Sequence, residues 1–288
     1  MDNIYACIPE ATRSIYGPTK EEQIENFLKA HPEYAMKVAK YDINDEQSIL
    51  DYMAVTLAER VGIPNMALKG GYVLNKRIKN CRKTYDIDFS IERKELYEDI
   101  KLALKDIGDE FVAAGIASDY VIKEDITETS SGGIKFSGCK TNRPLGVDVG
   151  LHTLGFGITS LHIVDTDVNV FSIERSLSDK LSVLCSRKRF RRVKDIYDIY
   201  VLISTYDVDY ALLKECMSYR DVSWDLYPDD ENVLVQLKRA YDMLEIGFSS
   251  AQKPAFAVVT QKLRKFCEPM LNENFIVSRW SCREERWL

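Results

Sequence analysis

Residues 68–90 read LKGGYVLNKRIKNCRKTYDIDFS, and this stretch decides which fold the chain is expected to have. A short apolar run, Met66-Ala67-Leu68, leads into the turn Gly70-Gly71. Tyr72 to Ile78 has the character of a helix, and Thr84 to Ile91 alternates apolar with polar residues as a half-buried strand does. The stretch therefore predicts a strand, a tight turn, a helix and a second strand in succession.

The turn at Gly70-Gly71 can bring the backbone close to an anion. Glycine adopts positive φ at no steric cost and lets backbone N–H groups approach a ligand. The helix expected after the turn would direct its N-terminal dipole at the same anion. A plain tight connection has the same sequence, so the turn alone leaves both interpretations open.

Asp86 and Asp88 are two positions apart in the expected strand, so their side chains point to the same face of the sheet. Tyr85, Ile87 and Phe89 cover the other face, which predicts a core on that side. Adjacent carboxylates repel each other, and a divalent cation such as Mg²⁺, which prefers oxygen ligands, relieves that repulsion. The alternative is a strand face with two solvated aspartates.

A third acid, Asp148, interrupts the apolar segment Gly146-Val147-Asp148-Val149-Gly150. A buried carboxylate is costly unless it is hydrogen-bonded or bound to a metal. If this strand pairs beside the strand of Asp86, the acids form a cluster of three carboxylates. An aspartate near a glycine bend at a strand end is the simpler alternative.

Around this stretch the pattern is mixed in the first half of the chain and helical in the second. A helix is expected from near Asn44 to Gly62 and another from Lys94 to Ala114. Further strands are expected at 120–127, 133–139 and 144–151, with Gly132-Gly133 as a hairpin turn, and helices at 175–188, 192–205, 208–219, 231–246 and 255–268. The fold class is therefore α+β, with a mixed sheet flanked by helices followed by a helical bundle. The expected domains are an N-terminal helical extension at 1–43, an α/β domain at 44–172 and a helical domain at 173–288.

The bulk composition indicates a soluble globular protein, because 45% of the residues are hydrophobic and 29% are charged. No run approaches the eighteen apolar residues of a membrane-spanning helix, and the N-terminus lacks the features of a secretory signal. The seven cysteines are scattered singly, which argues against a disulfide framework or a zinc site. These features predict a cytoplasmic protein.

The net charge is −6, but the positive charges are concentrated. Residues 65–85 contain basic residues and no acidic ones, and residues 187–194 contain six Lys or Arg in eight positions. Basic clusters on an acidic protein indicate a local site for a polyanion. A solvated helix face is the alternative.

Taken together, the Gly-Gly turn, the Asp-x-Asp strand and the third acid at Asp148 resemble the DNA polymerase β-like nucleotidyltransferases. Two later stretches, Glu174 to Leu181 and Arg191 to Tyr200, resemble the AbiEii/AbiGii-type members of that superfamily. These are the toxins of type IV toxin–antitoxin and abortive-infection systems. The resemblance extends over roughly residues 66–203.

The resemblance implies an enzyme that uses a nucleoside triphosphate (NTP) and Mg²⁺ or Mn²⁺, releases pyrophosphate and is neutralised by a separately encoded antitoxin. In that family, a lysine before the helical domain, here Lys180, and an Arg/Lys-Asp-x-x-Asp helix, here Lys194, Asp195 and Asp198, complete the active site. An ordinary ion-paired helix would have the same pattern. The expected metal ligands are Asp86, Asp88 and Asp148, and the expected catalytic residues are these three with Lys180 and Asp195. The residues expected to hold the nucleotide are Lys69, Gly70, Gly71, Lys180 and Lys194.

The acceptor hydroxyl is not specified by these residues. The basic run at 187–194 favours an RNA, such as the acceptor end of a tRNA. The acidic net charge favours the alternative, a small molecule or a protein hydroxyl. A nucleotide-binding module without turnover is the third possibility, although the presence of all three acids argues against it.

Overall fold

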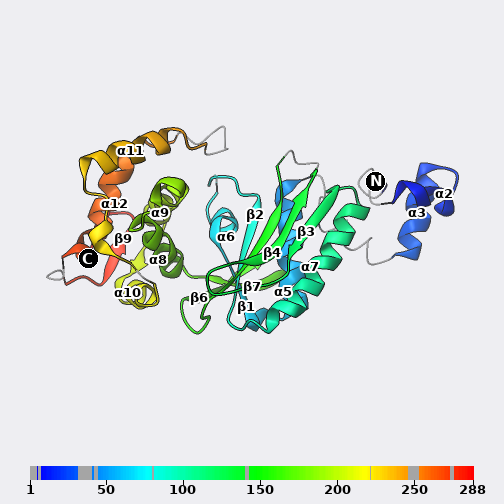
Figure 1. The fold of residues 1–288 in the computed structure, drawn as a ribbon, viewed down its shortest axis with the longest axis horizontal. Helices are drawn as coiled ribbons and strands as arrows, with labels where there is room; N and C mark the ends of the chain where they lie inside the picture. The colour runs from blue at the N-terminus through cyan, green and yellow to red at the C-terminus, as the bar shows by residue number, and fades with distance from the viewer. Residues whose placement is uncertain are drawn as a thin grey trace. The chain divides into compact units, whose positions relative to one another are not determined.

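The computed structural model describes residues 5, 8–31, 41, 45–79, 81–139, 143–220, 222–245, 253–272 and 276–288. The chain forms two compact units (Figure 1). The sheet unit comprises Met1–Tyr72, Thr84–Leu154 and Ser160–Val170, and the helical unit comprises Val73–Lys83, Gly155–Thr159 and Phe171–Leu288. Among the helices in the described ranges, none combines the length and the apolar character that crossing a bilayer requires.

The centre of the sheet unit is a seven-stranded mixed sheet in the order β3-β4-β5-β2-β1-β7-β6. Strand β2 pairs with β1 in the antiparallel and with β5 in the parallel direction, and β7 pairs with β1 in parallel. The strands are β1 (Met66–Lys69), β2 (Asp86–Ile91), β3 (Asp119–Lys123), β4 (Gly132–Ser137), β5 (Gly146–Leu151), β6 (Ile158–Ile163) and β7 (Thr166–Phe171).

The two faces of this sheet differ in character. On β2, Ile87 and Phe89 are buried on one face, and Asp86 and Asp88 alternate with them toward the other. Helices α5 (Glu46–Val61) and α7 (Leu96–Ala113) pack together and against the apolar face. The ring of Phe111 on α7, for example, lies 5.0 Å from that of Phe136 on β4, measured between centroids. The core therefore lies between this face and the two helices, and the opposite face carries polar side chains.

Local signals in the sequence explain where these helices begin and end. The side chain of Asp45 caps α5 by accepting a hydrogen bond from the Ser48 amide at 2.8 Å, and α5 stops before Gly62, whose φ is +86°. Helix α6 (Gly70–Arg77) begins at the Gly-Gly turn. The predicted succession of strand, turn, helix and strand over residues 66–91 is confirmed.

The N-terminal residues form a small helical cluster of η1 (Glu10–Thr12), α2 (Arg13–Tyr16) and α3 (Lys20–Ala30). Thr19 and Glu22 make a reciprocal capping box at the start of α3. Ile8, Ile24 and Phe27 are the buried residues of this cluster.

The helical unit contains α8 (Ile173–Leu184), η3 (Arg189–Arg191), α9 (Val193–Thr205), α10 (Tyr210–Ser218), η4 (Trp224–Leu226), α11 (Glu231–Asp242) and α12 (Phe256–Leu271). A second sheet, in the order β10-β9-β8, consists of β8 (Val208–Asp209), β9 (Arg279–Ser281) and β10 (Arg286–Trp287). It is tied to the helices by Trp280, which is fully buried and donates from its indole Nε1 to the Ile203 carbonyl at 2.8 Å.

The predicted α+β class is confirmed, with corrections in detail. The hairpin turn predicted at Gly132-Gly133 is wrong, because both residues belong to β4 and Gly133 pairs with Lys123 of β3. Strands β6 and β7 and the small C-terminal sheet were not predicted. The domain limits 1–43, 44–172 and 173–288 stay a prediction, although the helical unit resumes at Phe171, beside the last of them.

Candidate active site

The pairing of β2 with β5 brings the predicted acids together on the polar face of the sheet. Asp88 is the direct register partner of Asp148, and Asp86 is the partner of Gly146. Register partners in adjacent strands share a face, so all three carboxylates lie on the face opposite the core. The side chains of Asp86 and Asp148 are 48% and 30% exposed. Strands β2 and β5 therefore pair as the predicted three-acid cluster required, and the metal site itself stays a prediction.

Two lysines that were not predicted as site residues lie among these acids. The ammonium of Lys135 on β4 lies 3.3 Å from Asp86 Oδ1 and 3.1 Å from Asp148 Oδ2. Lys123 on β3 lies 3.4 Å from Asp148 Oδ1. Burial alone would lower the pKa of Lys135, but attraction to Asp86 and Asp148 outweighs burial and raises the pKa above the usual value. In the part of the chain that the structure describes, no three acid, His or Cys side chains converge as a metal site by themselves.

Gly70 is required by the position of Asp88. Its φ is +74°, and a Cβ built on it would lie 2.0 Å from Asp88 Oδ2. The carboxylate therefore rests directly against the turn, at the first residue of α6. A side chain at residue 70 and the present position of Asp88 exclude each other, which couples the Gly-Gly turn to the Asp-x-Asp strand.

Lys69, predicted to contact the nucleotide, is the register partner of Asp88 on β1. Its ammonium lies 3.2 Å from His152 Nε2, and His152 Nδ1 lies 3.0 Å from the Ser90 hydroxyl. Lys69 thus shares the polar face with the acids, next to the turn. The contacts of His152 with Lys69 and Ser90 could not be predicted from its position in the sequence.

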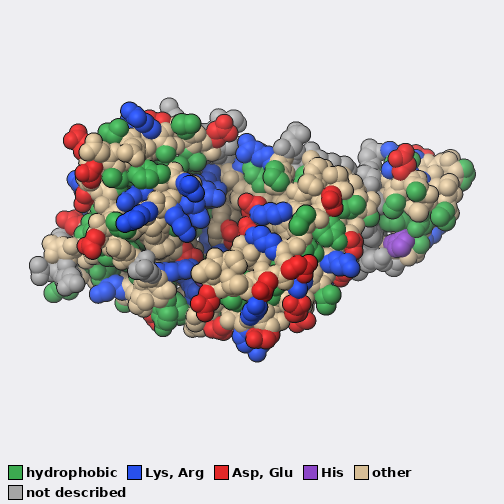
Figure 2. Space-filling model, viewed as in Figure 1, with side chains coloured by type: hydrophobic (Ala, Val, Ile, Leu, Met, Phe, Trp, Pro, Cys, Tyr) green, Lys and Arg blue, Asp and Glu red, His purple; other side chains and the backbone are tan. Residues whose placement is uncertain are grey.

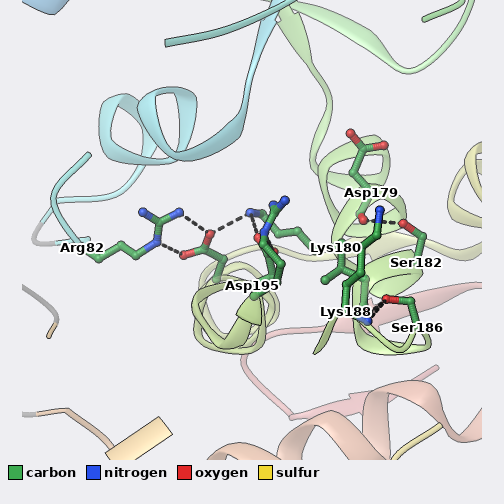
Figure 3. A network of polar contacts seen from close by, with 10 residues as sticks. Arg82, Asp179, Lys180, Ser182, Ser186, Lys188 and Asp195 are labelled. Atoms are coloured by element: carbon green, nitrogen blue, oxygen red, sulfur yellow. Dashed lines mark hydrogen bonds and ion pairs between the residues drawn. The ribbon is translucent and has the colours of Figure 1, made fainter. Parts of the chain in front are cut away.

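In the helical unit, Lys180, Asp195 and Asp198 belong to a buried ion network, drawn in Figure 3, whereas the predicted Lys194 is exposed. The ammonium of Lys180 on α8 lies 2.7 Å from Asp198 Oδ2 and 3.1 Å from Asp195 Oδ1, both acids on α9. The guanidinium of Arg82 donates to both Asp198 oxygens, at 2.7 and 2.8 Å. Arg192 contacts Asp195 at 2.8 Å. Each charge is therefore offset by a partner within the unit.

Burial and ion pairing shift the pKa values of the residues in this network in opposite directions. Burial alone would raise the pKa of Asp198, but Lys180 and Arg82 lower it to about 2. Burial opposes the charge on Lys180, whereas Asp198 and Asp195 raise its pKa above the ordinary value. The side chain of Lys180 is only 9% exposed. Its contacts in the structure are those of a buried counterion, and its predicted contact with a triphosphate stays a prediction.

Two of the basic residues assigned to polyanion sites are internal, which corrects the interpretation of the clusters. Arg82 is bound to Asp198, and Arg189 donates to the carbonyls of Leu184 and Leu226. A guanidinium can satisfy several acceptors at once, so a basic run in sequence does not distinguish surface from interior. Five residues of the run at 187–194 remain exposed, Arg187, Lys188, Arg191, Arg192 and Lys194. Figure 2 shows Lys and Arg side chains gathered over the part of the helical unit where α8 and α9 lie.

A mixed sheet with paired acids on its free face, next to a Gly-Gly turn, is typical of nucleotidyltransferases. The sequence profile described as "Nucleotidyl transferase AbiEii toxin, Type IV TA system" matches residues 52–255, well over half of the 288 residues. The chain belongs to this AbiEii family, whose members are nucleotidyltransferase toxins of type IV toxin–antitoxin systems. No curated protein matches the sequence in a direct comparison.

Solved structures with a similar course of the chain include a putative nucleotidyltransferase from H. pylori, with 16% identity and a TM-score of 0.49 over 78% of this chain and 96% of that one. JHP933 from Helicobacter pylori has 15% identity and a TM-score of 0.44 over 77% and 91%. An antigenic nucleotidyltransferase-like protein from Paracoccidioides brasiliensis has 16% identity and a TM-score of 0.38 over 72% and 96%. Because these identities and TM-scores are low, the assignment of the chain to the AbiEii family rests on the match of the sequence profile.

Proposed function

We propose that this nucleotidyltransferase moves a nucleoside monophosphate from an NTP to an acceptor hydroxyl with the help of Mg²⁺ or Mn²⁺ held by Asp86, Asp88 and Asp148. The observation that carries the proposal is the register of β2 and β5, which pairs Asp88 directly with Asp148. The Asp88 carboxylate lies against the turn at Gly70, so a phosphate bound by that turn would lie beside the acids.

The chemistry of the three side chains fits a hard divalent cation, although the described side chains do not converge on a single point without one. All three side chains offer carboxylate oxygens, the ligands that Mg²⁺ and Mn²⁺ prefer together with phosphate oxygens. The ammonium of Lys135 already pairs with two of these carboxylates. Its position supports the proposal that a cation is stabilised between them. When bound, such an ion neutralises charge on the triphosphate and on the departing pyrophosphate.

The residues of the chain have separate tasks in this reaction. The amides at the start of α6, from Gly70 and Gly71, bind phosphate oxygens, because the first N–H groups of a helix have no partner within it. Lys69, next to the turn, adds a positive charge on the same face of the sheet. Asp148 accepts the proton of the acceptor hydroxyl at one carboxylate oxygen.

An RNA is the favoured acceptor because of the five exposed cations at residues 187–194. Such a cluster attracts a phosphate backbone without reading its sequence. A small molecule or a protein hydroxyl is the competing acceptor, favoured by the net charge of −6. Family membership supports a role as a growth-inhibiting toxin with an antitoxin partner in the cytoplasm.

The test is transfer of label from each of the four α-labelled NTPs to total RNA, protein and small molecules. Label is expected in RNA, only with Mg²⁺ or Mn²⁺, and a chelator should abolish it reversibly. For about five phosphate contacts, RNA affinity should fall about 10²-fold between 50 and 200 mM salt. Label in the protein or small-molecule fraction alone would replace RNA as the acceptor. Transfer that persists in excess chelator would contradict the metal requirement.

Substitution of Gly70 by alanine tests the coupling of the turn to the acids. The new Cβ must displace the carboxylate of Asp88, and a shift of about 1 Å at a reacting centre can reduce a rate about 10²-fold. The rate of labelled-nucleotide transfer under saturating Mg²⁺ is the measurement.

Gly115→Ala is the matched control. Gly115 also has a positive φ, +63°, but nothing lies within 4 Å of its added Cβ. Both variants therefore incur the backbone penalty of about 1–2 kcal/mol, and only Gly70→Ala disturbs a carboxylate. Equal transfer rates in the two variants would show that Asp88 does not depend on the turn.

A further inference from the structure

The ammonium of Lys135 lies between two of the acids, Asp86 and Asp148. Lys135 is the register partner of Gly146, so it shares a face with Asp148 and reaches across that glycine to Asp86. Its ammonium is within 3.3 Å of one oxygen from each acid. A single positive charge thus joins the two strands that carry the acids.

The contacts of Lys135 are those of an exchangeable partner. Charge-assisted N–H···O bonds are usually about 2.7–2.9 Å long, and both of its contacts are longer than 3.0 Å. Its side chain is 44% exposed, and the four-carbon stem of lysine is flexible. Lys180, in contrast, lies 2.7 Å from Asp198 and 3.1 Å from Asp195, and its side chain is only 9% exposed. Lys135 is thus far more exposed to solvent than Lys180, as a lysine that exchanges with another cation must be.

Lys123 supports Asp148 from the other side and does not duplicate this role. Its ammonium lies 3.4 Å from Asp148 Oδ1 and 3.1 Å from the Ser131 hydroxyl. None of its described contacts involves Asp86. Lys135 alone among the described lysines joins the two acids.

We propose that Lys135 is a built-in counter-cation of the active site: it orients Asp86 and Asp148 in the metal-free protein, and a divalent cation must displace it to bind. The proposal rests on the proposed function and adds a positioning residue that sets the metal affinity. Metal binding is then an exchange of one cation for another. The carboxylates stay in place throughout, because one of the two cations always compensates them.

The exchange predicts that Lys135→Met binds metal more tightly than the wild-type protein. Mn²⁺ is titrated in the absence of nucleotide, and free Mn²⁺ is followed by electron paramagnetic resonance. Removing a competing charge at this distance from a partly exposed site should lower the Mn²⁺ dissociation constant about five- to tenfold. Without metal, the melting temperature of Lys135→Met should fall, because Asp86 and Asp148 then repel each other. Mn²⁺ should raise it by more than in the wild type.

Two further variants define the comparison. Lys135→Arg keeps the positive charge and should keep the metal affinity near that of the wild type. Lys94→Met removes a lysine of the same unit that pairs with the exposed Asp125 at 2.8 Å, away from the acids, and should leave Mn²⁺ binding unchanged.

The outcomes separate this inference from the proposed function. Wild-type binding of Mn²⁺ with no tightening in Lys135→Met, or with equal tightening in Lys94→Met, would overturn the role of Lys135 alone. Weaker binding in Lys135→Met would also overturn it, since the lysine would then assist the metal. Absence of Mn²⁺ binding in every variant would overturn the metal site itself, and this inference with it.

Discussion

Asp88→Asn and Asp148→Asn are each expected to reduce nucleotidyl transfer about 10³-fold, because each removes one carboxylate charge from the register pair that faces the proposed metal. A metal ion contributes several kcal/mol to transition-state stabilisation, and about 4 kcal/mol corresponds to this factor in rate. The measurement is the initial rate of label transfer at saturating NTP and Mg²⁺. Asparagine keeps the shape of the side chain, so both variants should fold as the wild type does.

The control for this loss is Asp99→Asn, which removes one exposed acid from the first turn of α7 in the same unit. Its transfer rate should match that of the wild type. If Asp88→Asn or Asp148→Asn retains more than about a tenth of the wild-type rate, the metal contribution would be under about 1.4 kcal/mol. The carboxylate pair would then not be the catalytic centre.

Asp198→Ala is expected to lower the free energy of unfolding of the helical unit by about 3–5 kcal/mol, the usual cost of removing one partner from a buried ion network. The substitution leaves Arg82 without its two carboxylate contacts and Lys180 with Asp195 alone. Both cations lie in the interior, where water cannot replace the lost partner.

Urea unfolding followed by tryptophan fluorescence measures the free energy of unfolding of the helical unit. Trp224, Trp280 and Trp287 are the three tryptophans of the chain, and all belong to the helical unit. Asp242→Ala is the control, since it removes an acid of the same unit that is 51% exposed and paired with Lys238. An exposed pair of this kind contributes at most about 1 kcal/mol. Equal losses in the two variants would contradict a stabilising role for the buried network.

The same network predicts how stability depends on acid. The pKa of Asp198 is about 2 in the folded protein, below its ordinary value of 3.8. A carboxyl group whose folded pKa is depressed contributes stability above the unfolded pKa, and this contribution is lost as the pH falls through the folded value. The wild-type helical unit should therefore lose stability between about pH 4 and pH 2. Asp198→Asn should show a flatter dependence in that range.

Local signals were sufficient to predict the elements that carry the acids. Alternation over residues 84–91 gave the strand and the face of Asp86 and Asp88, because side chains in a strand alternate with period 2. The lone acid Asp148 in an apolar segment indicated a strand with one polar position.

The unpredicted features depend on residues far apart in sequence. Lys135 lies between Ile134 and Phe136, and this alternation indicated that the lysine is on the polar face of the strand. The alternation did not indicate which residues the lysine contacts. Its partners are set by the pairing of β4 with β5 and of β5 with β2. Strands β6 and β7 were not predicted, and they are strands through pairing with the rest of the sheet.

The sequence by itself determined the turn at Gly70-Gly71 and the shared strand face of Asp86 and Asp88, because backbone freedom and strand periodicity are local properties. Only the tertiary structure decided that Asp148 stands beside Asp88, that Gly70 makes room for the Asp88 carboxylate and that Lys135 joins the acids. It also decided that Arg82, within the opening stretch of basic residues, is a buried counterion of Asp198. Charge and periodicity can be read along the chain, but partners are chosen by the packing that brings distant strands and helices together.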